Sequence, residues 1–144
     1  MECIVIEVFA GESVLTVVNV YDPPNKITNE EDYTTIFNQT GKAIIVGDFN
    51  THNTMWKSDT SDKRGHCIEE MIENINNVSL DTGTRTYQKA NEGMSVLDLS
   101  FASNAIANKC DWSIAEDNTW GSDHIACVTW IGDIKIKEND TSLK

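Results

Sequence analysis

Apolar and polar positions form two strand-like runs at the start of the chain. Residues 4–9 (IVIEVF) and 14–21 (VLTVVNVY) are rich in β-branched side chains, and residues 11–13 (GES) carry a turn signal between them. Two such runs on either side of a short turn are typical of antiparallel strands joined by a tight connection. The pattern therefore predicts a β-hairpin at the start of the chain.

Two further elements are predicted before residue 50. The only two prolines of the chain follow the hairpin. They end its second strand, because proline cannot donate a hydrogen bond to a neighbouring strand. The sequence Thr28-Asn-Glu-Glu31 fits a capping box, which predicts a short helix to about Asn38. Residues 43–46 (AIIV) then form an apolar run that is typical of a buried strand.

A second helix is predicted after Asp62, which can serve as its N-cap. Four apolar residues recur there at positions i, i+3, i+4 and i+7, and this spacing places them on one helical face. They are Ile68, Met71, Ile72 and Ile75. We expect this face to pack against the core of the domain.

The second half of the chain predicts short strands at residues 78–80, 95–101, 110–115 and 125–131. Asp98 interrupts the apolar run of the second of these strands. A carboxylate in such a position needs a charged or hydrogen-bonding partner, because an unpaired buried charge is costly. We therefore expect Asp98 to have a partner elsewhere in the fold.

The length of 144 residues is sufficient for one domain with a packed core. Apolar periodicity continues to about Ile131 and is lost beyond it. We therefore predict a single domain over residues 1–131 and a polar tail over residues 132–144, where terminal residues commonly fray.

The net charge of the chain bears on whether it binds nucleic acid. The chain has 11 Lys and Arg residues against 23 Asp and Glu residues, a formal net charge of −12. A negative field repels nucleic acid, because basic side chains that neutralise phosphates supply most non-specific affinity. The charge counts against a strong DNA binder. It is better explained by metal-binding carboxylates and a solvated acidic surface.

Four cysteines are scattered along the sequence, at Cys3, Cys67, Cys110 and Cys127. No two of them have the Cys-x-x-Cys spacing of a zinc site, so we expect buried thiols in a reducing compartment. The first residues lack the basic region of a secretory signal, and no apolar run approaches membrane-spanning length. We therefore expect an intracellular protein, in the nucleus or cytoplasm, with no membrane partner.

The candidate chemistry begins where the predicted strand at residues 43–46 ends. Asp48, Asn50 and His52 occupy alternate positions after Gly47. Alternate side chains of an extended chain point the same way, so a carboxylate, an amide and an imidazole would project into one small volume. By residue type alone, an ordinary Asn- and Asp-rich turn after a strand is the commoner structure.

Polar residues at other predicted strand ends add to this group. Carboxylates bind hard cations such as Mg²⁺ or Mn²⁺ and can activate a water molecule. An amide, a phenol hydroxyl and a protonated imidazole can donate hydrogen bonds to a phosphoryl transition state. Such a set is suited to cleaving a phosphodiester with the help of a metal. Its members are Tyr21, Asp48, Asn50, Asp98, Asp123 and His124.

The motifs that carry these residues resemble a known superfamily, the endonuclease/exonuclease/phosphatase superfamily of abasic-site endonucleases and pancreatic DNase. His52, Trp56 and the Arg64-Gly65 pair are most similar to the endonuclease domain of non-LTR (LINE-type) retrotransposons. The resemblance covers nearly the whole chain to about Ile131. It rests on four motifs in order: Val20-Tyr21-x-Pro23-Pro24, Gly47-Asp48-Phe49-Asn50, Ser95-x-x-Asp98 and Ser122-Asp123-His124.

The resemblance implies an α/β (α+β) fold, a four-layer α/β/β/α sandwich of the DNase-I-like type. It also implies a role for each site residue. Asp48 would position or activate the nucleophilic water and lie near the metal. Asn50 would bind the scissile phosphate and stabilise the transition state, and Tyr21 would donate a hydrogen bond to that phosphate.

The resemblance assigns the remaining three residues to the metal and the phosphate. Asp123 would be a metal-proximal carboxylate. His124, paired with Asp98, would contact a phosphate oxygen as a cation. The implied cofactor is Mg²⁺ or Mn²⁺, and the implied substrate is DNA. A reverse transcriptase domain of the same polyprotein is the implied partner.

We therefore expect a Mg-dependent phosphodiesterase, the DNA-nicking endonuclease domain of a retrotransposon-type protein. The superfamily also uses an Asn and a metal-ligating Glu on strands that precede its Tyr-x-Pro segment. The candidates Glu2, Glu7 and Glu12 lie on the hairpin that the superfamily places after its metal Glu. We expect a fold that is incomplete at its N-terminal side, with an exposed edge and apolar face.

Two alternatives remain at this point. One is a catalytically dead remnant that retains only the fold of the endonuclease domain. The other is a phosphatase of the same superfamily, which the spacing of His52 and Trp56 makes the more remote.

Overall fold

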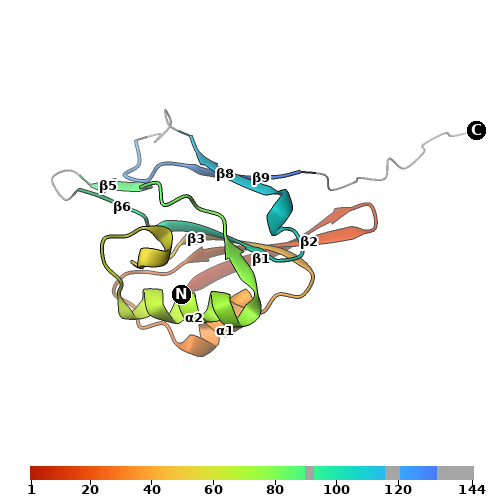
Figure 1. Cartoon of the computed structure of the whole chain (residues 1–144), viewed down its shortest axis with the longest axis horizontal. Helices are drawn as coiled ribbons and strands as arrows, with labels where there is room; N and C mark the ends of the chain where they lie inside the picture. The colour runs from red at the N-terminus through yellow and green to blue at the C-terminus, as the bar shows by residue number, and fades with distance from the viewer. Residues whose placement is uncertain (90–92, 116–120, 133–144) are drawn as a thin grey trace, which may run out of the picture.

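The computed structural model describes residues 1–89, 93–115 and 121–132. A five-stranded sheet forms the centre of the molecule. Two helices lie on one side of this sheet, and a pair of short strands lies on the opposite side (Figure 1). The fold is α+β, and these described elements form three successive layers.

The central sheet has the strand order β1-β2-β3-β7-β4. β1 (Glu2–Ala10) and β2 (Ser13–Tyr21) form the predicted antiparallel hairpin. β3 (Lys42–Asp48) runs parallel to β2 and antiparallel to β7 (Asp98–Ser103). β4 (Asn77–Ser79) closes the far edge and pairs with β7. β3 is the central strand, and three of its residues are fully buried as its apolar sequence predicts.

Two small sheets accompany the central one. β5 (Tyr87–Lys89) pairs with β6 (Gly93–Ser95), and β8 (Cys110–Ile114) pairs with β9 (Cys127–Ile131). A single 3-10 turn, η2 (Ala107–Lys109), precedes β8. Most of the predicted polar tail lies outside the described residues, so its structure stays a prediction.

The predicted strand at residues 95–101 is two elements in the structure. β6 ends at Ser95 and β7 begins at Asp98. Between them the backbone N–H groups of Leu97 and Asp98 donate to the Thr86 hydroxyl, at 3.3 and 3.1 Å. A side chain therefore replaces a neighbouring strand as hydrogen-bond partner there, and Asp98 starts a strand rather than interrupting one.

The helices pack side by side against the sheet. α1 (Glu30–Phe37) begins at Asn29 instead of at the predicted capping residue Thr28. The Asp32 carboxylate accepts the Asn29 backbone N–H at 3.2 Å, so the capping pair is shifted by one residue from the predicted one. The Thr28 hydroxyl donates to a buried carboxylate instead. Thr28 therefore bonds to the preceding loop, and Asn29 takes the N-cap position.

α2 (Lys63–Ile75) begins after Asp62, as predicted. The Asp62 carboxylate accepts the Gly65 N–H at 2.7 Å, and it also accepts the His52 N–H at 2.8 Å. Ile68, Met71 and Ile72 are buried on the face predicted from their spacing. A 3-10 turn, η1 (Thr54–Trp56), leads toward this helix.

Aromatic side chains fill the core between the helices and the sheet. The rings of Phe37, Phe49 and Phe101 contact one another with centroids 5.1–6.2 Å apart. Trp56 is 1% exposed and packs in the same core cluster.

The hairpin strand β1 is an exposed edge. Its apolar side chains are open to solvent on both faces, with Ile4 68% and Phe9 71% exposed. Cys3 is exposed too, because β1 has no covering layer among the described residues, so the expectation of a buried thiol is wrong for it. Cys67, Cys110 and Cys127 are only partly buried. The expected exposed edge and apolar face are present.

The two environments of phenylalanine give a stability test. Phe101→Ala removes a fully buried ring and should lower the free energy of unfolding by about 3–5 kcal/mol. Phe9→Ala makes the same chemical change at a 71% exposed position and should change it by less than about 1 kcal/mol. Urea unfolding followed by circular dichroism measures both. Equal losses would contradict the assignment of the core to the helix side of the sheet.

Candidate active site

Three predicted site residues lie in one row across the central sheet. In the register of β2, β3 and β7, Tyr21 pairs with Asp48, and Asp48 pairs with Asp98. Directly paired residues point to the same face of a sheet, so these three side chains share a face at the same end of three strands. The row continues to the exposed Glu2 on β1. This is the face that lies opposite the helices.

Gly47 allows the strands to come together at this row. It has φ of +148°, and a Cβ atom placed there would lie 1.9 Å from the Val20 carbonyl oxygen. Any larger residue would force β2 away from β3 immediately beside Asp48. The Gly-Asp sequence therefore has a packing reason as well as a chemical one.

His124 joins the row from a segment distant in the sequence. Its Nδ1 lies 2.9 Å from Asp98 Oδ2, and its Nε2 lies 4.0 Å from Asp48 Oδ2. A β-bridge to Tyr87 and a ring contact with centroids 4.9 Å apart hold the imidazole in place. The expected partner of Asp98 is therefore His124, and the imidazole lies between two carboxylates.

Asn50 also contacts the carboxylate of Asp48, through both its side chain and its backbone. Its side-chain amide donates to Asp48 Oδ2 at 2.8 Å, and its backbone N–H donates to Asp48 Oδ1 at 3.1 Å. Its φ of +47° is left-handed, which is uncommon for a residue other than glycine. The turn that follows β3 thus aims the Asn50 amide at Asp48.

Electrostatics couple these groups. Burial and the neighbouring Asp98 charge raise the pKa of Asp48 above its usual range, against the opposing hydrogen bonds from Asn50. Burial lowers the pKa of His124, but the hydrogen bond and charge of Asp98 and the charges of Asp48 and Asp123 outweigh it. The net result is a raised pKa for His124. The imidazole therefore carries a proton more readily than a free histidine does.

A cleft of about 430 Å³ opens beside these residues. Gly47 and Asp98 line it from the central sheet, and Ser122, His124 and Cys127 line it from the segment that enters β9. The Asp98–His124 pair therefore borders open space rather than solid core. Burial raises the pKa of the Cys127 thiol to about 12, which makes this cysteine a poor nucleophile.

The predicted metal ligands are only partly assembled. Asp123 is exposed, and its backbone carbonyl accepts the Gln88 N–H at 2.8 Å. Within the described ranges, no group of three or more His, Cys, Asp or Glu residues is arranged to hold a metal ion. Asp48 and Asp98 are oxygen donors of the kind that Mg²⁺ binds through one or two carboxylates, keeping several waters. These carboxylate oxygens are the kind of ligand that a largely hydrated Mg²⁺ takes. The described residues supply few such ligands.

The structure separates the predicted residues into a group and two outliers. Asp48, Asn50, Asp98 and His124 contact one another through the interactions above. Tyr21 lies beside Asp48 in the register, and its side chain is 47% exposed. Tyr21 and Asp123 therefore lie at the margin of the group. The chemical roles assigned to all six stay predictions.

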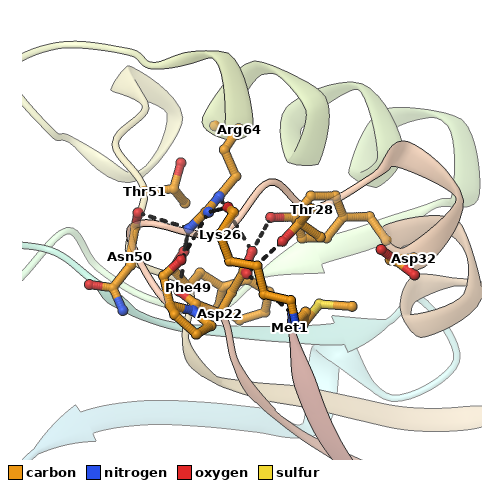
Figure 2. A network of polar contacts seen from close by, with 12 residues as sticks. Met1, Asp22, Lys26, Thr28, Asp32, Phe49, Asn50, Thr51 and Arg64 are labelled. Carbon is orange, nitrogen blue, oxygen red and sulfur yellow. Dashed lines mark hydrogen bonds and ion pairs between the residues drawn. The ribbon is translucent and has the colours of Figure 1, made fainter.

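Three residues that support this group were not singled out from the sequence. Thr86 is fully buried, and its hydroxyl fixes the backbone at the start of β7. Ser122 accepts the His124 N–H at 3.0 Å. Arg64, noted only as part of a motif, bonds to the backbone carbonyls of the loop after β3 (Figure 2). The roles of Thr86 and Arg64 have no local sequence signal, because their partners lie twelve to fifteen residues away in the chain. The Ser122 contact is local, two residues from His124.

Comparison with known families identifies the domain. The family model described as "Endonuclease-reverse transcriptase" matches residues 15–128, most of the chain. The chain belongs to this endonuclease–reverse transcriptase family. The matched range contains Tyr21 and His124, and so it spans every predicted site residue of this family member.

Solved structures agree with the family at the level of the fold. The endonuclease domain of TRAS1, a telomere-specific non-LTR retrotransposon, superposes with a TM-score of 0.77 at 23% identity. The match covers 90% of this chain and 63% of that one. The catalytic domain of Xenopus laevis APE2 has a TM-score of 0.55 at 16% identity, covering 85% of this chain and 52% of that one. The family member therefore has a DNase-I-like fold and spans just over half to less than two-thirds of these structures.

A search of curated proteins returns no match for this sequence. Among the described residues, no helix has both the length and the apolar character needed to cross a membrane.

The Asp98–His124 contact can be tested by titration. We expect the pKa of His124, followed by NMR, to lie above about 6.5, the value of an unperturbed histidine. Asp98→Asn should lower it, because the replacement removes the charge that favours the imidazolium. Since the folded pKa is raised, this pair stabilises the fold below pH 6.5, and the contribution is lost as pH rises through the folded pKa.

A matched control separates this effect from a general change in net charge. Asp59→Asn removes one negative charge from an exposed carboxylate that pairs with Arg85. It should leave the His124 titration almost unchanged. An equal decrease in both variants would contradict the assignment of Asp98 as the partner that sets the pKa.

Proposed function

We propose that this chain is a Mg-dependent phosphodiesterase, the DNA-nicking endonuclease domain of a retrotransposon polyprotein that also carries a reverse transcriptase. The observation that supports this most is the contact of His124 with both Asp98 and Asp48 at the edge of a cleft. The match to an endonuclease family supports DNA as the substrate class. We take residues 1–131 as the extent of the domain.

Asp48 and Asn50 would act on the water and the phosphate. A carboxylate with a raised pKa is a better base than a free one, so Asp48 can orient or deprotonate an attacking water. The Asn50 amide, which donates to Asp48 in the free protein, can turn its donor to a bound phosphate oxygen. Tyr21 would add a hydroxyl donor from the neighbouring strand.

His124 and Asp98 would form the cationic half of the site. Asp98 holds one ring nitrogen at 2.9 Å, which fixes the orientation of the imidazole and favours its protonated form. The other nitrogen, now near Asp48, can donate to a phosphate oxygen that enters between them. The charge on the imidazolium would stabilise the developing negative charge of the transition state.

A bound Mg²⁺ would supply Lewis-acid stabilisation of the phosphate and leaving group. Asp48 and Asp123 are the residues we assign to it, with Asp98 as a neighbouring oxygen donor. A cation there would also relieve the repulsion between the carboxylates of Asp48 and Asp98, which face each other across paired strands. Neutralising carboxylates in this way lowers the barrier that a net charge of −12 presents to DNA.

The scarcity of assembled metal ligands among the described residues and the strongly acidic surface favour a second candidate. This is a domain that keeps the endonuclease fold without its chemistry. A phosphatase of the same superfamily is the third, and a panel of phosphomonoesters would reveal it. The nicking experiment below distinguishes the first two.

Conversion of supercoiled plasmid to open circles measures the proposed activity. We expect the full chain to nick plasmid in the presence of Mg²⁺ and to stop when the metal is chelated. Asp48→Ala and His124→Ala should each reduce nicking by at least about 100-fold, the size of a lost general base or transition-state donor. The change is read from gel densitometry over time.

The matched control for these variants is Asp111→Asn, on the exposed side of β8. It removes a negative charge away from the site and should keep full activity. Absence of nicking by the unaltered chain would overturn the catalytic proposal in favour of the non-catalytic fold. Equal nicking by Asp48→Ala would overturn the assignment of the site.

The pH dependence of nicking gives a second test. The rate should follow a bell shape, because Asp48 must be ionised and His124 protonated at the same time. Both pKa values are raised, so the whole profile should lie at higher pH than free Asp and His would give. Asp98→Asn should move the alkaline limb to lower pH. An alkaline limb that does not move would contradict a catalytic imidazolium.

A further inference from the structure

Arg64 joins two loops that border the proposed site. It lies in the first turn of α2, and its side chain is only 14% exposed. Its guanidinium donates to the Phe49 and Asn50 carbonyls, at 3.1 and 3.3 Å. It also donates to the carbonyls of residues 22, 23 and 26, at 3.3, 3.1 and 2.6 Å. Five carbonyl oxygens from two segments therefore converge on one side chain (Figure 2).

A buried carboxylate balances the charge of Arg64. Asp22 is fully buried, and its Oδ2 lies 3.4 Å from Arg64 Nε. Thr28 donates to Asp22 Oδ1 at 2.6 Å, and the Tyr33 hydroxyl donates to Oδ2. A buried charge is tolerated only when it is paired and hydrogen-bonded in this way. Burial and the bond to Asp22 raise the pKa of Tyr33, so its hydroxyl stays a donor.

The two loops are continuous with the proposed catalytic residues. The first begins at Asp22, directly after Tyr21, and the Asp22 N–H donates to the Asp48 carbonyl at 2.9 Å. The second consists of Phe49 and Asn50, directly after Asp48. Arg64 therefore bonds to the backbone immediately beyond the ends of β2 and β3. A displacement of the guanidinium would therefore displace the ends of both β2 and β3.

Asn50 depends most on this support. A left-handed backbone at a residue other than glycine persists only where the surroundings impose it. The carboxylate of Asp48 holds the Asn50 N–H, and Arg64 holds its carbonyl oxygen. The peptide groups on both sides of the residue are thereby fixed. This conformation directs the side-chain amide at Asp48.

The loop after Asn50 is held to the same helix end. The Asp62 carboxylate accepts the Thr51 hydroxyl at 2.6 Å as well as the His52 N–H. A Cβ atom at Gly65 would lie 2.1 Å from the His52 carbonyl oxygen, so glycine is required for this approach. The start of α2 therefore packs against residues 49–52, the loop that follows β3. Arg64 makes the contact between this helix and Asn50.

We propose that Arg64 is a positioning residue of the site, which fixes Asn50 in its left-handed conformation and aligns the ends of β2 and β3. The inference rests on the proposed function for its catalytic consequence and on the geometry alone for its conformational one. Lysine cannot substitute, because a single ammonium with three donors cannot serve five carbonyls that match the planar fork of a guanidinium.

Arg64→Lys keeps the charge opposite Asp22 and removes the fork. We expect kcat for plasmid nicking to fall roughly 10- to 100-fold, since small misplacements at a site have effects of this size. KM should change less than about threefold, because Arg64 does not face the cleft. The control is Arg85→Lys, the same change at a 52% exposed arginine paired with Asp59, which should leave both constants unchanged.

NMR supplies a readout that does not depend on catalysis. The backbone signals of Asn50 should shift in Arg64→Lys. Those of Lys57, another left-handed residue with φ of +60° and no bond to Arg64, should not. If Arg64→Lys does not fold, Asp22→Asn replaces it, and the same selective shift is expected because the guanidinium loses its counter-charge.

The two readouts separate this inference from the proposed function. A chain that does not nick at all overturns the proposed function, and the Asn50 signals then decide the positioning role alone. Unchanged Asn50 signals in a folded Arg64→Lys variant would overturn the inference, whatever the activity. If kcat of Arg64→Lys is no lower than kcat of Arg85→Lys, the inference is overturned as well.

Discussion

The register of β3 against its two neighbours is the constraint on which the rest of the site depends. One strand pairs in parallel with β2 and antiparallel with β7, and Asp48 at its end pairs with Tyr21 on one side and Asp98 on the other. A shift of one residue would turn the carboxylates to opposite faces, because side chains alternate along a strand. Gly47 maintains the close approach that this register needs.

The same register creates an electrostatic problem that His124 resolves. Two carboxylates on paired strands repel each other, and burial raises the pKa of Asp48 further. The imidazole of His124 enters between them with one nitrogen bonded to Asp98 and the other near Asp48. The arrangement raises the pKa of both Asp48 and His124 beside one cleft. The proposed phosphodiester chemistry would use a stronger base and a more readily protonated imidazole.

Stability and chemistry are divided between the two faces of the central sheet. The helix side carries the aromatic core, and Arg64 extends from that side to the loops that border the site. The opposite face carries the polar row and is only partly covered by β8 and β9 (Figure 1). The exposed apolar residues of β1 show that this sheet has unburied surface among the described residues.

The sequence alone predicted most element types, because hydrophobic period and turn residues are local signals. It placed the hairpin, the central strand β3, the second helix with its Asp62 cap, and polar residues at strand ends, but it did not predict β5. It did not determine the start of α1 or the break before Asp98. There the Thr28 hydroxyl bonds to Asp22, six residues earlier, and the Thr86 hydroxyl accepts the Asp98 N–H, twelve residues later. Only the tertiary structure decided that His124 contacts Asp98 and Asp48 and that Arg64 holds Asn50, because hydrogen bonds between separate segments have no local sequence period.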